Sequence, residues 1–260
     1  MSSSNKIIPN KSEVADSIQS AIGDGLSKNT GELIIDGLTN TGIMGSSGPD
    51  LDDIQTDDVT LVSISLDASS SMSGVTQDVI DSFNEMLRAL KKSKNAESIL
   101  LSAWTFNTQT NLLFGYTPVT EVPELTILDY SPSGATALYD TLADSITGLV
   151  SYGQQLRDGG IRTKNIILTF SDGEDNSSNK RARDIKTLAE DLLKQETYIL
   201  AYVGFGYDAD GIADVVGFPT KLQDEHDPSA IRRAFDQVSQ SIISTSQTAI
   251  GPGSQNAFFN

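Results

Sequence analysis

Residues 60–71 form the stretch TLVSISLDASSS. Its first part, residues 60–66, is compact and rich in Leu, Val and Ile, which predicts a buried strand. Asp67, Ser69 and Ser71 follow at a spacing of two and are separated by small residues. An extended or loop backbone with that alternation can point three side-chain oxygens in the same direction. The stretch therefore predicts a strand that ends in a cluster of oxygen donors.

Strands and helices alternate through the rest of the chain. Further strands are predicted at residues 98–106, 112–116, 165–170, 197–203 and 220–223, and apolar residues at helical spacing predict helices within 79–90, 138–149, 182–192, 210–216 and 231–242. The strand at 112–116 is expected to be an antiparallel edge. This order predicts an α/β fold of the Rossmann-like, doubly wound type, with a mainly parallel central sheet, one antiparallel edge strand and helices on both faces.

Two helix starts carry cap signals. Ser178 or Asn179 is placed to cap the helix at 182–192, because short polar side chains accept hydrogen bonds from the first free amides of a helix. Asp227 followed by Pro228 predicts the start of the final helix.

Residues 1–57 are predicted to be an N-terminal extension. Apolar residues at about four-residue spacing predict one short amphipathic helix there, marked by Val14, Ile18, Ile22 and Leu26. Residues 33–35 are expected to form a small strand, and residues 45–58 an acidic linker.

The α/β domain itself is expected to span residues 58–246. Residues 247–260 are expected to form a flexible C-terminal tail, since residues 251–256 read GPGSQN. The tail contains Phe258 and Phe259, which are either exposed aromatics of a docking motif or, as we expect, part of a disordered end.

Composition argues against several classes of protein. The 260 residues carry a formal net charge of −17 and a pI of about 4.2. This balance argues against binding nucleic acid or an anionic membrane, both of which select basic patches. The chain has no Cys, which excludes disulfides and Cys-ligated zinc. No run approaches the roughly 20 apolar residues of a membrane-spanning helix, and no secretory signal is visible, so we expect a soluble cytoplasmic protein.

Two other segments carry oxygen donors at corresponding places. Residues 133–140 read SGATALYD and offer Thr136 at the entrance to a helix. Residues 170–175 read FSDGED and offer Asp172 closely after a strand. In open α/β sheets, ligands bind at the carboxyl ends of the parallel strands. All three donor segments are therefore expected on the same rim of the sheet.

Together these donors predict a metal site formed by Asp67, Ser69, Ser71, Thr136 and Asp172. Each residue alone is equally typical of a helix cap or a turn, and only their convergence predicts a site. All-oxygen donors suit hard cations, and we expect Mg²⁺, with Ca²⁺ or Mn²⁺ as alternatives. Two carboxylates only just balance a divalent charge, and a six-coordinate Mg²⁺ would still need water or a foreign oxygen. The cation is therefore expected to keep a position open for an outside anion.

At this point the chain resembles a von Willebrand factor type A (vWA) domain over roughly residues 58–246. The match consists of an Asp-x-Ser-x-Ser loop, a Ser-Gly-x-Thr-x-Leu segment and a strand-ending Ser-Asp-Gly, in the order of the family. The resemblance implies a metal-ion-dependent adhesion site in which the five donors hold the cation, directly or through water. It further implies that a Glu or Asp of a partner protein completes the coordination. Ser70 stands where many members carry Gly.

Other polar residues beside these segments have open roles. Glu174 and Asp175 are expected to be rim charges, and Asp140 is either an acceptor behind the site or a simple helix carboxylate. His226 is the only His and is expected in a surface loop or cap. Three basic residues form a solvated helix face or steer an acidic ligand towards the metal: Lys180, Arg181 and Arg183.

The leading functional hypothesis is a non-enzymatic, metal-dependent protein-binding module. The resemblance implies a scaffold or adaptor of the intracellular bacterial kind, which works beside AAA⁺ ATPases or in stress and defence systems. The alternative is a metal-dependent hydrolase or phosphatase, although no phosphate-binding loop or nucleophile elbow is present. A third hypothesis is that the acidic segment 50–58, from this chain or from a second copy, occupies the metal site; nothing else indicates a homo-oligomer.

Overall fold

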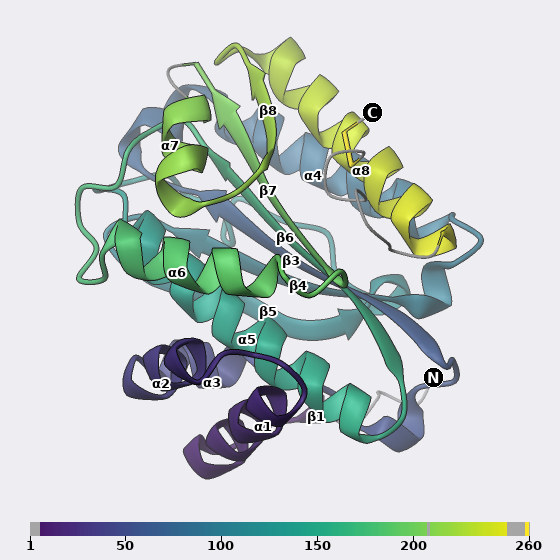
Figure 1. The fold of residues 1–260 in the computed structure, drawn as a ribbon. Helices are drawn as coiled ribbons and strands as arrows, with labels where there is room; N and C mark the ends of the chain where they lie inside the picture. The colour runs from purple at the N-terminus through teal and green to yellow at the C-terminus, as the bar shows by residue number, and fades with distance from the viewer. Residues whose placement is uncertain (1–5, 207–208, 249–257, 260) are drawn as a thin grey trace.

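A six-stranded sheet forms the centre of the molecule (Figure 1). This computed structural model describes residues 6–206, 209–248 and 258–259. The strands of the sheet are β3 (Asp58–Asp67), β4 (Ile99–Phe106), β5 (Thr110–Pro118), β6 (Arg162–Ser171), β7 (Tyr198–Phe205) and β8 (Thr220–Asp224). The order across the sheet is β5-β4-β3-β6-β7-β8. Every neighbouring pair is parallel apart from β4 and β5. This confirms the predicted fold class.

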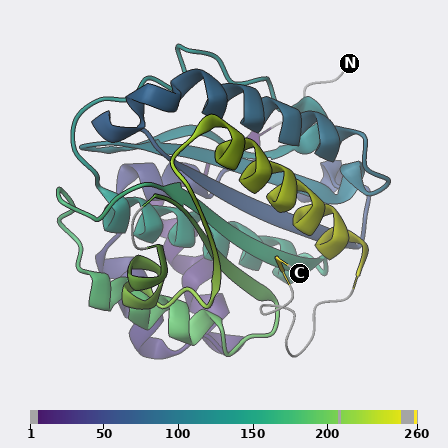
Figure 2. The ribbon, with the colours of Figure 1, turned by 90° about the horizontal axis from the view of Figure 1, so that it is seen from above.

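Helices cover both faces of this sheet (Figures 1 and 2). One face carries α4 (Thr76–Lys91) and α8 (Pro228–Gln247), and the other carries α5 (Leu138–Asp158), α6 (Ala182–Leu192) and α7 (Ala209–Val216). Successive strand residues point to opposite faces, so Val62 joins the apolar core beneath α4 and α8, whereas Leu61 joins the core beneath α5. Asp227 caps α8 and Pro228 is its first residue, as predicted.

Short 3-10 helices lie in several connections: η1 (Leu51–Asp53), η2 (Ser70–Val75), η3 (Ala96–Ser98) and η4 (Val119–Glu121). The one beside the predicted donors is η2, because it follows the Asp67 end of β3 and leads into α4. It turns the chain away from the sheet within one short segment, so the side chains of that segment stay at the rim.

Residues 6–49 form an additional layer outside α5, which we call the N-terminal layer (Figure 1). It consists of β1 (Lys6–Ile7), α1 (Lys11–Gly23), α2 (Lys28–Asp36), α3 (Asn40–Gly45) and β2 (Gly48–Pro49). The expected amphipathic helix is α1, which buries Val14 and Ile18 completely. Its packing places this layer against the face of the sheet that α5 and α6 cover.

The strand expected at residues 33–35 is wrong, because this segment lies inside α2. The β-branched pair Ile34-Ile35 favours a strand in isolation. The hydroxyl of Ser27, however, accepts a hydrogen bond from the Thr30 amide at 3.2 Å and starts a helix. That helix buries Ile34 to 2% exposure, so tertiary packing overrides local preference.

The prediction of an acidic linker at residues 45–58 also needs correction, because the first part of this segment is buried. Ser46 and Ser47 are nearly inaccessible, and the Ser47 carbonyl accepts a hydrogen bond from the Tyr116 amide at 2.8 Å. A Cβ added to Gly148 of α5 would lie 2.7 Å from the carbonyl oxygen of Gly45. This close backbone approach of α3 to α5 requires glycine.

The end of the chain folds back onto the domain. Phe258 is 4% exposed and belongs to the core beneath α4 and α8, so the expectation of exposed or disordered aromatics is wrong for this residue. The side-chain amide of Gln237 donates a hydrogen bond to the Phe259 carbonyl at 2.7 Å. The remainder of the expected flexible tail, residues 249–257 and 260, lies outside the described residues.

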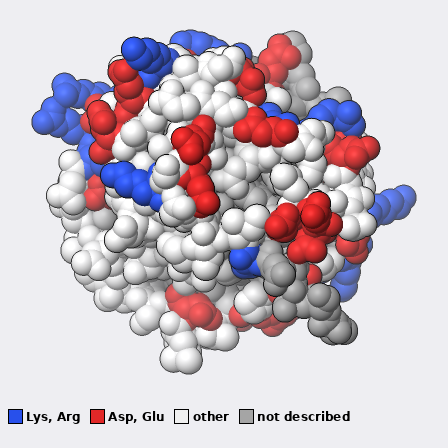
Figure 3. Space-filling model, turned by 90° about the horizontal axis from the view of Figure 1, so that it is seen from below, with Lys and Arg blue, Asp and Glu red and all other residues white. Residues whose placement is uncertain are grey.

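The side of the molecule that carries the N-terminal layer is shown in Figure 3. Asp and Glu side chains form separate groups on it, with Lys and Arg between some of them, and a broad area carries no charge. Among the described residues, no helix combines the length and the apolar character needed to cross a membrane.

Candidate metal centre

Asp67 is the last residue of β3 and lies almost completely buried at 1% exposure. One carboxylate oxygen accepts a hydrogen bond from the Ser69 amide at 2.8 Å, and the other accepts one from the Ser171 hydroxyl. Because these partners are neutral, burial dominates and raises the pKa of Asp67 to about 6. A buried carboxylate of this kind is stabilised when a cation lies beside it.

Three further predicted donors form a continuous chain of contacts beside Asp67. The hydroxyl oxygens of Ser69 and Ser71 are 3.0 Å apart. The Ser71 hydroxyl donates a hydrogen bond to Oδ1 of Asp172 at 2.8 Å. Asp172 follows β6, the direct neighbour of β3 in the sheet, which explains why residues about 100 positions apart meet here. The predicted convergence of the first and third donor segments is therefore present.

Thr136 is joined to this group through its backbone segment. The Ser133 amide donates to the Ala68 carbonyl at 2.8 Å, and the Ser70 amide donates to the Gly134 carbonyl at 3.2 Å. Gly134 has a φ of 76°, a conformation that side-chain-bearing residues rarely adopt. Thr136 itself is 5% exposed. The second donor segment thus lies against the first. The side-chain hydrogen bonds run from Ser69 through Ser71 to Asp172, and the Ser69 amide joins Asp67 to them.

The start of α5 is capped by the segment that follows Asp172. The first helical residues have no capping side chain of their own. Instead, Asn176 accepts a hydrogen bond from the Thr136 amide at 2.8 Å, and Asp175 accepts one from the Tyr139 amide at 3.3 Å. The bond to Tyr139 satisfies a free amide of the first helical turn, and the bond to Thr136 holds the residue just before the N-cap. Asp175 is therefore more than the expected rim charge, since it helps to hold the Thr136 segment against the Asp172 segment.

α5 caps the same segment in return. The Asp140 carboxylate accepts hydrogen bonds from the backbone amides of Asn179 and Lys180, at 3.0 and 2.8 Å. The Ser178 hydroxyl accepts from the Asp140 amide at 3.0 Å. The expectation that Ser178 or Asn179 caps α6 is wrong, because α6 begins after Arg181 without a side-chain cap. Asp140 therefore acts as an acceptor behind the candidate site, since it orders the connection between the rim and α6.

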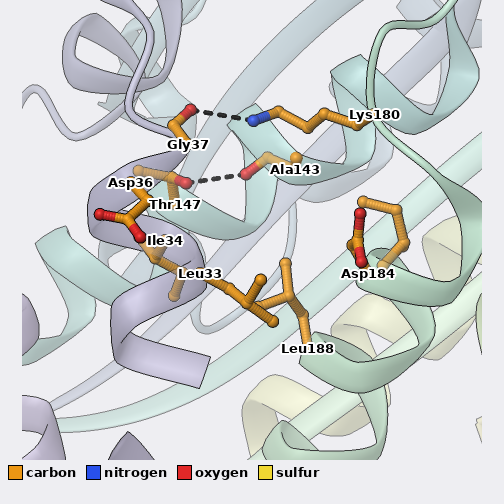
Figure 4. Close-up of a pocket in the computed structure, with 10 residues that line it drawn as sticks. Leu33, Ile34, Asp36, Gly37, Ala143, Thr147, Lys180, Asp184 and Leu188 are labelled. Carbon is orange, nitrogen blue, oxygen red and sulfur yellow. Dashed lines mark hydrogen bonds between the residues drawn. The ribbon is translucent and has the colours of Figure 1, made fainter. Parts of the chain in front are cut away.

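Lys180 connects this segment to the N-terminal layer. Its ammonium group donates a hydrogen bond to the Gly37 carbonyl at 2.9 Å, at one end of a cleft of about 260 Å³ between α2, α5 and α6 (Figure 4). Leu33 and Leu188 line the cleft from α2 and α6. Lys180 is therefore a structural link rather than a member of a solvated face, and a steering role for Arg181 and Arg183 stays a prediction.

His226 lies in the exposed connection between β8 and α8, as predicted, and this connection brings it to the candidate site. Its Nδ1 is 3.7 Å from Oδ2 of Asp172, and its side chain is 29% exposed. The signal that could have found it is its position just after β8, because the carboxyl ends of parallel strands share one rim.

The donor set fits a hard divalent cation. Adjacent oxygen ligands on an octahedral Mg²⁺, each at about 2.1 Å from the ion, lie about 3.0 Å apart. The Ser69–Ser71 and Ser71–Asp172 oxygen pairs, at 3.0 and 2.8 Å, have this spacing. Within the described part of the chain, no group of three or more His, Cys, Asp or Glu is arranged to hold a metal. The candidate centre is thus of the mixed carboxylate and hydroxyl kind.

Several solved structures with a similar fold come from bacterial pili. The SpaC pilus adhesin of Lactobacillus rhamnosus GG has a TM-score of 0.57 and 11% identity, over 73% of this chain and 30% of that one. The D319A mutant of the PilB minor pilin of Streptococcus sanguinis has a TM-score of 0.55 and 14% identity, over 80% of this chain. This chain spans 64% of the length of that pilin structure.

A further similar structure is the vWF domain of the type V pili tip protein Mfa5 from Porphyromonas gingivalis, with a TM-score of 0.51 and 12% identity. The match covers 74% of this chain and 97% of that domain. At such identities the similarity establishes the fold alone. The chain therefore has the vWA-like fold that the sequence pattern suggested. Its sequence matches no protein-family model and no curated protein.

Proposed function

We propose that this protein is a metal-dependent protein-binding module. Its five donors would hold a divalent cation, with Mg²⁺ preferred and Ca²⁺ or Mn²⁺ accepted, and a Glu or Asp of a partner protein would become a further ligand. The observation that carries the proposal is the chain of contacts Ser69–Ser71–Asp172 at the spacing of metal ligands, next to the buried Asp67 carboxylate. When bound, the cation supplies an electrophilic centre for an outside carboxylate.

The residues of the chain have separate tasks in this proposal. Asp67 and Asp172 balance the charge of the cation. Ser69 and Ser71 add neutral donors, so that no surplus negative charge repels the partner carboxylate. Asn176 and Asp140 hold the neighbouring segments in place through backbone amides. This division of tasks is typical of a site whose outer shell orients its ligands.

An exposed apolar turn supports docking of a protein rather than of a small ion alone. Leu128 is 92% exposed and Ile127 is 56% exposed. Asp129 closes the turn by accepting hydrogen bonds from the Thr126 amide and hydroxyl at 2.8 and 2.6 Å. Rigid apolar side chains lose little conformational entropy on binding, which favours them as contact residues.

The same turn is anchored to the candidate site. Tyr130 is fully buried, and its hydroxyl donates a hydrogen bond to the Asp67 carbonyl at 2.6 Å. On the other side, the Asn84 side chain pairs with the Leu125 backbone in both directions, at 2.9 and 2.7 Å. A partner that places a carboxylate on the cation would therefore find Leu128 at a defined position nearby.

The setting of the module is the finer part of the proposal. We infer a scaffold or adaptor, which the resemblance associates with bacterial stress, defence or AAA⁺ ATPase systems.

Self-inhibition by the acidic segment 50–58 is disfavoured within one chain, because Asp58 begins β3 and Asp67 ends it. That strand is about 30 Å long, so the segment would have to come from a second copy.

The test compares cation binding and partner binding in matched variants. We expect calorimetry to detect Mg²⁺ binding to the wild type and to Glu174→Ala, which removes an exposed neighbouring carboxylate, but not to Asp172→Ala. Partner capture from the native cell should require Mg²⁺ and should disappear with chelator or with Asp172→Ala. Capture that persists under both conditions would refute the proposal. Sustained hydrolysis of phosphate esters that Asp172→Ala abolishes would favour the hydrolase instead.

A further inference from the structure

His226 is held in a defined place by its neighbours on both sides. The Asp224 carbonyl accepts a hydrogen bond from the Gly206 amide at 2.8 Å, and the Asp224 carboxylate pairs with Arg233 at 2.7 Å. Asp227 is the N-cap of α8 and accepts hydrogen bonds from the first amides of that helix. His226 lies between these two fixed residues, so its backbone is held at the rim.

The imidazole faces the oxygen of Asp172 that Ser71 does not use. Ser71 donates to Oδ1 of Asp172, whereas Oδ2 is 3.7 Å from Nδ1 of His226. Two ligands at about 2.1 Å from one cation are about 3.0 Å apart in an octahedral site and about 3.4 Å apart in a tetrahedral one. The distance between Nδ1 of His226 and Oδ2 of Asp172 is 0.7 Å longer than the octahedral value and a few tenths of an ångström longer than the tetrahedral value. A rotation of either side chain can close this difference.

The two donor types select different cations. Mg²⁺ prefers oxygen ligands and gives up its water reluctantly, so a neighbouring imidazole adds little to its binding. Co²⁺, Ni²⁺ and Zn²⁺ bind imidazole well. Where some of the five oxygens act through water, an imidazole can replace one of these waters and still leave a position for a partner carboxylate. Such a site discriminates among divalent cations differently from a site with oxygen ligands alone.

We infer that His226 is a specificity-determining residue of the candidate metal centre, where its Nδ1 and Oδ2 of Asp172 together bind cations of the Co²⁺, Ni²⁺ and Zn²⁺ class. The inference rests on the proposed function only in requiring that the centre holds a divalent cation. It adds a nitrogen donor to the oxygen set and makes the choice of cation a property of the β8–α8 connection.

The experiment measures relative cation affinities of the full, untagged chain at neutral pH. Calorimetric titrations with Mg²⁺, Co²⁺ and Ni²⁺ are run on the wild type, on His226→Ala and on Glu225→Gln, which changes an exposed neighbour. We expect His226→Ala to lower Co²⁺ and Ni²⁺ affinity at least 10-fold and Mg²⁺ affinity less than about twofold. Glu225→Gln should leave the ratio unchanged. The visible absorption spectrum of bound Co²⁺ should also change in His226→Ala.

The outcomes separate this inference from the proposed function. An unchanged ratio of Ni²⁺ to Mg²⁺ affinity, or an equal loss for both cations, overturns the role of His226 while Mg²⁺ binding still supports the proposed function. Absence of all cation binding by the wild type overturns both. A selective loss of Co²⁺ and Ni²⁺ affinity, accompanied by a changed Co²⁺ spectrum, supports the assignment.

Discussion

The rim of the sheet and the N-terminal layer are held to the domain by different forces. At the rim, side chains such as Asp140 and Asn176 hydrogen-bond to backbone amides of other segments. In the N-terminal layer, apolar residues such as Val14 are fully buried, and Gly45 lies in backbone contact with Gly148. Hydrogen bonds fix directions, whereas close packing fixes shape. Changes at the rim should therefore alter cation binding, and changes in the layer should alter stability.

Within the described residues, two polar links join the N-terminal layer to segments that lead to the rim. Lys180 donates to the Gly37 carbonyl at 2.9 Å, and the Thr39 hydroxyl donates to the Asp144 carboxylate at 2.9 Å. Asp144 belongs to α5, the helix whose first turn is tied to the rim. Substitutions in each region can therefore show whether the regions can be altered separately.

The largest effect is expected from Asp67→Ala at the rim. It removes one of only two carboxylates, so Mg²⁺ affinity should fall more than about 1,000-fold, or about 4 kcal/mol. The fold should persist without cation, because the substitution also removes a poorly solvated charge. Thermal unfolding in Mg²⁺ and in chelator measures both effects. A variant that Mg²⁺ still stabilises would contradict the assignment of Asp67.

Gly148→Ala tests the layer. The added Cβ would lie 2.7 Å from the Gly45 carbonyl oxygen, so we expect a loss of about 2–3 kcal/mol in the free energy of unfolding. Gly23→Ala is the control, because its Cβ meets nothing within 4 Å. Urea unfolding and calorimetry should show lower stability and unchanged Mg²⁺ affinity for Gly148→Ala. A large loss of cation affinity would show that the regions are coupled.

Asp144→Asn tests the link between the regions through pH. Burial raises the pKa of Asp144 from 3.8 to about 6. The folded state therefore retains a proton that the unfolded state releases, and stability falls as the pH rises from about 4 to about 6. Above pH 6 the ionised group costs up to roughly 3 kcal/mol. Urea unfolding should show Asp144→Asn more stable than the wild type above pH 6, by a margin that shrinks towards pH 4; a constant margin would contradict this.

Asp140→Asn should loosen the rim without removing a metal ligand. The amide that replaces the carboxylate cannot accept equally well from the backbone amides of Asn179 and Lys180. We expect about a 10-fold loss of Mg²⁺ affinity by calorimetry. Asp78→Asn, in the first turn of α4, is the matched control and should leave affinity unchanged. Equal Mg²⁺ affinities of the two variants would show that Asp140 does not position the site.

The smallest effect is expected from Leu128→Ser. The side chain is 92% exposed, so stability should change by less than about 0.5 kcal/mol and Mg²⁺ affinity should stay the same. Partner affinity should nevertheless fall, because the apolar contact beside the cation is lost. Unchanged partner affinity in Leu128→Ser would show that Leu128 is not part of the docking surface.

Much of the fold was predictable because apolar periodicity is a local signal. The buried strands and the helices between them follow it directly, and the antiparallel edge β5 was predictable from its short link to β4. The helical structure of the segment containing Leu33 and Ile34 was not predictable in this way. The Ser27 cap and contact with α6 outweigh the strand preference of the segment. Burial of Ser47 involves a partner far along the chain, because its carbonyl accepts a hydrogen bond from the Tyr116 amide.

The candidate site shows the same division. The positions of Asp67 and Asp172 at strand ends were sufficient to place them on one rim, and their contact through Ser71 follows from the adjacency of β3 and β6. The nearness of His226 was not predicted, because β8 reaches the rim two strands away from β6. The capping role of Asp175 was also missed, because a carboxylate looks the same in sequence whether it caps a helix or faces solvent.

The sequence by itself determined the element order, the parallel sheet and the chemical kind of the five donors, because these depend on local periodicity and residue type. The tertiary structure alone decided the capping between α5 and the Asp172 segment, the seating of the N-terminal layer and the place of His226. Each of these depends on a direction or a fit between residues distant in the chain, and such relations exist only after the sheet has brought its loops together.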